Sequence, residues 1–191
     1  MSVKMTLLWN RKWIWCCILF FAAILFSYLQ PLQFDEGGEA TFLSMLMLVL
    51  IGYFFGAKNA ILATVLFGLL KYVIDYRSMN NLAEFLDYVL GYGVLCVGGI
   101  VAYHTGKLKL GYTVGGLLRY VESIINCILF YYEPTDSLWA NIWEGISYSA
   151  YYVIAEYILT MIILLFPAVC EAIEYWKHVA THEKKENLNT Y

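Results

Sequence analysis

The clearest candidates for chemistry in this sequence are ionisable side chains that lie inside long apolar stretches. They are Lys71, Asp87, Arg119, Glu122 and Glu156. Charged side chains are costly at membrane depth, so those that occur there usually face a protein interior and serve a function. Asp87 has no basic residue within four positions on either side. We therefore predict that Asp87 is a ligand-binding carboxylate.

The other four charged residues have alternative explanations. Arg119 and Glu122 are three residues apart, a spacing that places them on neighbouring parts of one helical face. They can therefore neutralise each other as a buried ion pair. Glu156 can pair with Arg119 or with Lys71. The sequence leaves the pairing among these four residues open.

Aromatic side chains are concentrated near the same chemistry. Tyr88 and Tyr92 accompany Asp87, and the segment "FYYEPTDSLWANIWEGISYSAYY" (130–152) interleaves aromatic with acidic residues. Aromatic faces combined with a carboxylate suit a flat organic cation, through cation–π attraction and charge pairing. An aromatic belt at the membrane–water interface explains part of the same pattern without a ligand. Both interpretations stay open at this point.

The composition identifies the medium in which these residues must be positioned. The chain has 191 residues, of which 61% are hydrophobic and 14% charged, and its mean hydropathy is +0.63. Soluble domains are about 45–50% apolar and about 25% charged. We therefore predict an integral membrane protein. The first apolar run follows Arg11 and Lys12, but no A-x-A cleavage pattern comes after it, so we interpret it as a retained helix.

A helix needs about 20 apolar residues to cross a bilayer. The candidate spans are Trp13–Leu29, Thr41–Phe55, Ala60–Ile74, Leu82–Tyr103, Leu110–Tyr132 and Ile146–Phe166, with a tight turn at Gly56–Asn59 between the second and third. If both termini are cytoplasmic, most lysines and arginines fall in the inner segments, as the positive-inside rule requires. We predict an all-α bundle of six transmembrane helices.

One domain accounts for the whole chain. Residues 1–170 form the predicted membrane domain, and residues 171–191 form a polar cytoplasmic tail that we expect to be frayed. Small residues at Gly111 and Gly115 allow close helix approach, either within the bundle or toward a partner. No nucleotide-binding, hydrolase or metal-ligand motif occurs. We predict a protein that is not an enzyme, holds no cofactor or metal, and binds no nucleic acid.

Four segments carry a resemblance to a known family. They are "EGGEATFLSMLMLVLIGYFFGAKNAILATVLFGLLKYVI", "EFLDYVLGYGVLCVGGI", "RYVESIINCILFYY" and "YSAYYVIAEYILT". Their order and spacing resemble the thiamin-specific S components (ThiT type) of energy-coupling-factor transporters, over roughly residues 15 to 167. The resemblance implies a six-helix protein of the bacterial plasma membrane that captures vitamin from outside. It also implies partners, namely a transmembrane coupling protein and two ATPase subunits.

The resemblance also implies substrate-binding positions. They fall on Asp87, Tyr88, Tyr131, Trp139 or Trp143, and Tyr148. The family's His in the fifth helix falls on Ser123, its Asn in the sixth helix on Val153, and a pocket Gly on Cys127. The expected ligand is therefore thiamin, a thiamin precursor or a related cationic heterocycle. The alternatives are a small accessory or structural membrane protein and a stand-alone small transporter.

Overall fold

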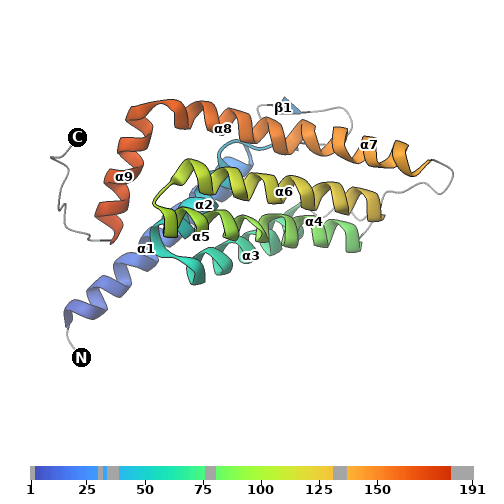
Figure 1. Cartoon of the computed structure of the whole chain (residues 1–191). Helices are drawn as coiled ribbons and strands as arrows, with labels where there is room; N and C mark the ends of the chain where they lie inside the picture. Colours follow the sequence, from blue (N-terminus) through green and yellow to red (C-terminus); the bar gives the residue numbers. More distant parts are fainter. Residues whose placement is uncertain (1–2, 30–31, 34–38, 76–80, 131–136, 182–191) are drawn as a thin grey trace.

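The computed structural model describes residues 3–29, 32–33, 39–75, 81–130 and 137–181, and within these ranges the chain is almost entirely helical (Figure 1). The helices are α1 (Val3–Ser27), α2 (Ser44–Phe55), α3 (Ala57–Ile74), α4 (Asn81–Gly93), α5 (Leu95–Thr105), α6 (Leu108–Phe130), α7 (Leu138–Ser149), the π-helix η1 (Ala150–Ile154), α8 (Ala155–Leu165) and α9 (Pro167–Thr181). Two short antiparallel strands, β1 (Leu32–Gln33) and β2 (Glu39–Ala40), lie between α1 and α2.

Within the described residues, four apolar segments are long enough to cross a membrane. They are Ala57–Ile74, Leu82–Thr105, Leu108–Phe130 and Leu138–Leu165, so α4 with α5, and α7 with η1 and α8, each act as one span. The apolar parts of the first two helices, Lys12–Ser27 and Ser44–Phe55, are shorter. The helical membrane fold is therefore confirmed. The count of six spans and the cytoplasmic position of the termini stay predictions.

Helix α2 occupies the centre of the bundle because its sequence is apolar on every side. Residues such as Leu48, Ile51 and Tyr53 are almost completely buried, as expected for a helix without a polar face. Helices α1, α3, α5 and α6 pack around it. The chain turns from α2 into α3 at Gly56, whose φ of 82° suits glycine. This confirms the predicted break, although α3 begins immediately afterwards.

Helices α5 and α6 approach each other through glycines. A Cβ atom at Gly98 would lie 2.6 Å from the main-chain oxygen of Gly111 and 2.9 Å from the Cα of Gly115. The Gly111-x-x-x-Gly115 motif therefore serves packing inside this chain. Helix α6 in turn lies between α4 and α5 on one side and α7 on the other (Figure 1). Helix α6 is therefore the element through which polar residues of α4 and of α7 can come into contact.

The expectation of a frayed tail from Glu171 is wrong up to Thr181. Residues Pro167–Thr181 form α9, which runs at a steep angle to α8 (Figure 1). Contacts that attach it to the bundle include the hydrogen bond that the Tyr53 hydroxyl donates to the Glu174 carboxylate and the Trp15 and Trp176 rings, which lie 5.3 Å apart. Proline is favoured at the first helical position, which explains the sharp start.

Candidate functional site

A group of charged side chains joins α4 to α6 within the bundle. The Nη1 atom of Arg119 donates to the main-chain oxygen of Asp87 at 2.5 Å and lies 3.5 Å from the Asp87 carboxylate. The same atom lies 3.2 Å from Oε2 of Glu122, one turn further along α6. The Arg119 side chain is nearly buried, since only 5% of the residue is exposed. We call Asp87, Arg119 and Glu122 the charged cluster.

The charged cluster changes the interpretation of Asp87. Its basic partner comes from a helix 32 residues further along the chain, so a search within four positions could not find it. One guanidinium faces two carboxylates, which gives the cluster one net negative charge when all three groups are ionised. The Asp87 Oδ1 atom, which lies 3.5 Å from Nη1 of Arg119, is buried and accepts no hydrogen bond in the part of the chain that the structure describes. A carboxylate whose oxygen accepts no hydrogen bond retains the capacity to bind a cation.

A glycine makes room for this arrangement. A Cβ atom at Gly91 would lie only 1.1 Å from Nη1 of Arg119, so a larger residue there would require the guanidinium to shift. The Cζ atom of Arg119 lies 4.8 Å from the centre of the Tyr92 ring, a cation–π contact. The Tyr88 ring lies almost parallel to that of Tyr92, with 6.5 Å between their centres. Aromatic rings thus line one side of the cluster.

A group of hydroxyl side chains lies next to the charged cluster, where Ser123 follows Arg119 by one turn of α6. The Ser123 hydroxyl shares hydrogen bonds with Ser149, at 2.9 Å, and with Tyr152. Tyr152 belongs to η1 and is close enough to Asp87 and Arg119 to interact with both electrostatically. The Tyr148 ring lies 5.5 Å from the Tyr152 ring. A π-helix often marks a functional position, because the extra residue in its turn redirects the side chains.

The structure brings some of the predicted binding residues together and leaves others apart. Asp87, Tyr88 and Tyr148 all lie in or beside the charged cluster and the hydroxyl group. Trp139 and Trp143 lie on the surface of α7 and are 79% and 71% exposed. Tyr131 falls outside the described residues. The roles of these six residues in binding stay predictions.

Sequence reasoning missed Tyr152 and Ser149 as the partners of Ser123. Tyr152 follows Tyr148 by four residues, about one helical turn. This spacing places Tyr152 on the same helix face as a predicted binding residue, which was the available signal. The position that the resemblance assigns to histidine is thus filled by a serine together with a tyrosine from η1. Val153, at the position of the family's Asn, is 3% exposed. Among the described residues, no group of three His, Cys, Asp or Glu side chains could hold a metal ion.

The remaining intramembrane charges are satisfied elsewhere. The Lys71 ammonium pairs with Asp75. The Glu156 carboxylate accepts hydrogen bonds from Thr41, Ser44 and the main-chain N–H of Met45. Glu156 therefore forms an ion pair with neither Arg119 nor Lys71, and Arg119 pairs with Asp87 as well as with Glu122.

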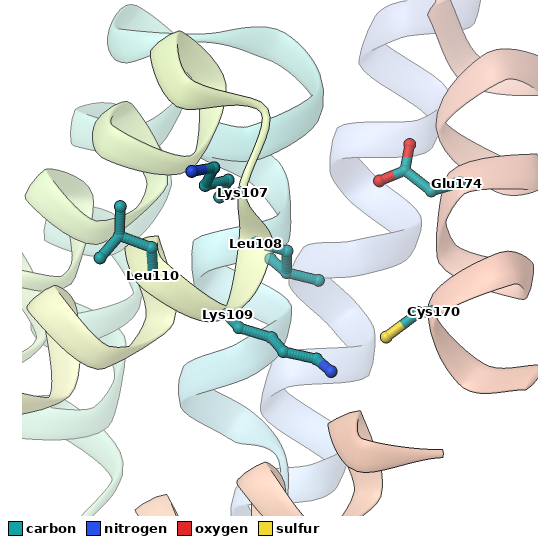
Figure 2. Close-up of a pocket in the computed structure, with 6 residues that line it drawn as sticks. All are labelled: Lys107, Leu108, Lys109, Leu110, Cys170 and Glu174. Carbon is teal, nitrogen blue, oxygen red and sulfur yellow. The ribbon is translucent and has the colours of Figure 1, made fainter. Parts of the chain in front are cut away.

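A separate cavity of about 430 Å³ lies far from the charged cluster. It is formed by Lys107, Leu108, Lys109 and Leu110 around the start of α6 and by Cys170 and Glu174 of α9 (Figure 2). At about 1.5 Å per helical residue, the start of α6 lies about 16 Å from Arg119 along the helix axis. Two lysines at its edge make this cavity unsuited to a cation, so we do not place the ligand here.

The fold and the cluster define the class of this protein: a multi-pass helical membrane protein with a buried, net-acidic group of side chains bordered by tyrosines. The profile of the family described as thiamine transporter protein (Thia_YuaJ) matches residues 13–174. The chain therefore belongs to this transporter family, which confirms the resemblance.

A solved structure of ThiT from Listeria monocytogenes has the same fold. It is 18% identical in sequence, covers 79% of this chain and 91% of its own, and superposes with a TM-score of 0.57. The comparison with curated proteins gave no match.

Proposed function

We propose that this protein is the substrate-binding S component of an energy-coupling-factor importer and that its ligand is thiamin or a close cationic relative. The observation that carries the proposal is the charged cluster, in which one arginine faces two carboxylates. Thiamin carries a permanent positive charge on its thiazolium ring. The remaining negative charge of the cluster matches that cation.

The residues beside the cluster suit the rest of such a ligand. The Tyr88 and Tyr148 rings, with Tyr92 and Tyr152 next to them, offer flat faces for a heterocycle and for its cation. The hydroxyl groups of Ser123 and Tyr152 can exchange their mutual hydrogen bond for one to a pyrimidine nitrogen. Tyr131, Trp139 and Trp143 are included in the proposed site on the basis of the family resemblance.

The energy for uptake is proposed to come from partners. The sequence contains no phosphate-binding loop, so the chain by itself has no recognisable means of using ATP. We infer a coupling membrane protein and two ATPase subunits in the bacterial plasma membrane, with ligand captured from outside. Co-purification of those subunits with the tagged chain from its native membrane tests this part of the proposal.

A thermal-shift series on the detergent-solubilised protein tests the ligand. Thiamin should raise the melting temperature, whereas its two neutral halves, the hydroxyethyl-methylthiazole and the aminopyrimidine alcohol, should have little effect alone. Stabilisation by the neutral thiazole as strong as that by thiamin would contradict a role for the cation. Tryptophan fluorescence should be quenched on binding, and Trp139→Phe and Trp143→Phe variants would show whether either residue reports it.

Two other functions predict different experimental results. An accessory or structural membrane protein would show no stabilisation with any vitamin and no associated ATPase. A stand-alone transporter would accumulate radiolabelled thiamin in vesicles that contain this chain alone.

A further inference from the structure

Glu156 contacts the first turn of α2 through hydrogen bonds, and the proposed ligand site does not use it. It lies in α8, is 4% exposed, and accepts hydrogen bonds from a segment more than a hundred residues earlier in the chain. Thr41 donates to its Oε2 atom, while the Ser44 hydroxyl and the Met45 N–H donate to Oε1 at 3.1 and 3.0 Å. We call this set of contacts the Glu156 anchor.

Helix α2 needs this anchor because its own sequence provides no cap. Leu43, the residue before the helix, has φ 60° and ψ 2° and makes no capping hydrogen bond through its side chain. A leucine in this left-handed region is strained and stays there only when its surroundings hold it. The first N–H groups of a helix need external acceptors, and a carboxylate is favoured there by the helix dipole. Glu156 supplies that acceptor.

The anchor lies next to the elements of the proposed site. Strand β2, immediately before Thr41, contacts η1, the segment that carries Tyr152. Glu156 follows Tyr152 by four residues, about one helical turn, so the same stretch of helix holds both the hydroxyl contact to Ser123 and the anchor. In the view of Figure 1, β1, the partner strand of β2, is drawn above this long helix. The end of the α1–α2 connection is therefore in contact with η1 and with the helix that continues from it.

We propose that Glu156 is a positioning residue that fixes the end of the α1–α2 connection against η1 and thereby keeps Tyr152 and Ser123 in place for a bound ligand. The part of this proposal that concerns the ligand rests on the proposed function. Loss of the anchor should release the start of α2, loosen η1 and let the ligand leave faster. No ligand contact by Glu156 itself is required.

The test compares three variants in full-length protein in detergent. Glu156→Ala removes the anchor. Glu156→Gln retains an oxygen that can accept hydrogen bonds from Met45 and Ser44, and its amide group can donate to the Thr41 hydroxyl. This variant should therefore preserve the Glu156 anchor. Glu174→Ala is the matched control, because it removes a carboxylate that also joins two helices, through Tyr53 and far from η1. If Glu156→Ala does not fold, Ser44→Ala removes one arm of the anchor from the other side.

The first measurement is hydrogen exchange without ligand, and the second is the dissociation rate of radiolabelled thiamin. In Glu156→Ala we expect exchange of the amides at 45–47 and 150–154, and release of thiamin, to be about tenfold faster, the size expected for a lost buried hydrogen-bond partner. Glu156→Gln and Glu174→Ala should resemble the wild type in both.

Each failure has a distinct meaning. Unchanged exchange at 45–47 in Glu156→Ala would overturn the anchor itself. Faster exchange at 45–47 with unchanged exchange at 150–154, or with an unchanged thiamin rate, would show that the anchor does not position η1 for binding. If the wild type binds no thiamin, the proposed function fails, and the exchange data alone still decide whether Glu156 holds η1.

Discussion

The guanidinium of Arg119 occupies the space that a side chain at Gly91 would need, since a Cβ atom there would lie 1.1 Å from Nη1. Gly91 follows Asp87 by one turn of α4, so the glycine opens the helix surface where the arginine must pass to reach the carboxylate. The close contact between α4 and α6 therefore depends on a missing side chain as much as on the charges.

Gly91→Ala should displace Arg119 and break its contacts with Asp87. Breaking a buried ion pair costs about 3–5 kcal/mol, so we expect a large drop in the melting temperature and weaker thiamin binding. Gly93→Ala is the control on the same helix, because nothing lies within 4 Å of a Cβ atom there. That variant should be neutral or stabilised by up to about 1 kcal/mol. Equal behaviour of the two variants would contradict the proposed steric role.

Asp87→Asn and Glu122→Gln should each weaken thiamin binding. Either change removes the net negative charge of the cluster, and a hydrogen bond or contact to a charged group is worth about 1.5–3 kcal/mol, so we expect an affinity loss of at least about tenfold. Titration calorimetry on the solubilised protein measures it. Glu144→Gln, which removes an exposed carboxylate from α7, should bind normally. If both cluster variants bind like the wild type, charge does not select the ligand.

Arg119→Leu should be rescued in part by Asp87→Asn. The single variant leaves two carboxylates in the bundle without their cation, and an uncompensated buried charge is strongly destabilising. Removing one of the two charges relieves part of that cost, so the double variant should melt at a higher temperature than Arg119→Leu alone. Additive losses in the double variant would show that Arg119 and Asp87 act independently.

Tyr152→Phe and Ser123→Ala should be non-additive. Each removes one partner of the same hydrogen bond between η1 and α6, so the double variant should lose less than the sum of the two single variants, although Ser123→Ala also loses the bond to Ser149. A double-mutant cycle on the free energy of unfolding in detergent should give a coupling of about 1 kcal/mol. A coupling near zero would indicate that the bond does not help to hold η1.

The sequence by itself determined the medium, the main helices and the identity of the charged candidates. Hydropathy and length are local properties, so the apolar segments could be read directly from the order of residues. The break at Gly56 follows from the same local rules, whereas the central position of α2 became visible only in the structure. The family resemblance was also available from sequence, because its motifs keep their order and spacing.

Only the tertiary structure decided which polar groups of different helices meet. Asp87 has its cation on α6, 32 residues away, and Glu156 has its donors at the start of α2, 111 residues from Met45. Such pairs depend on which helices are neighbours and on their rotation, and no local pattern contains that information. Helix α9 was missed for the same reason: its charged sequence suggested a frayed tail, but Tyr53 and Trp15 provide partners that hold it against the bundle.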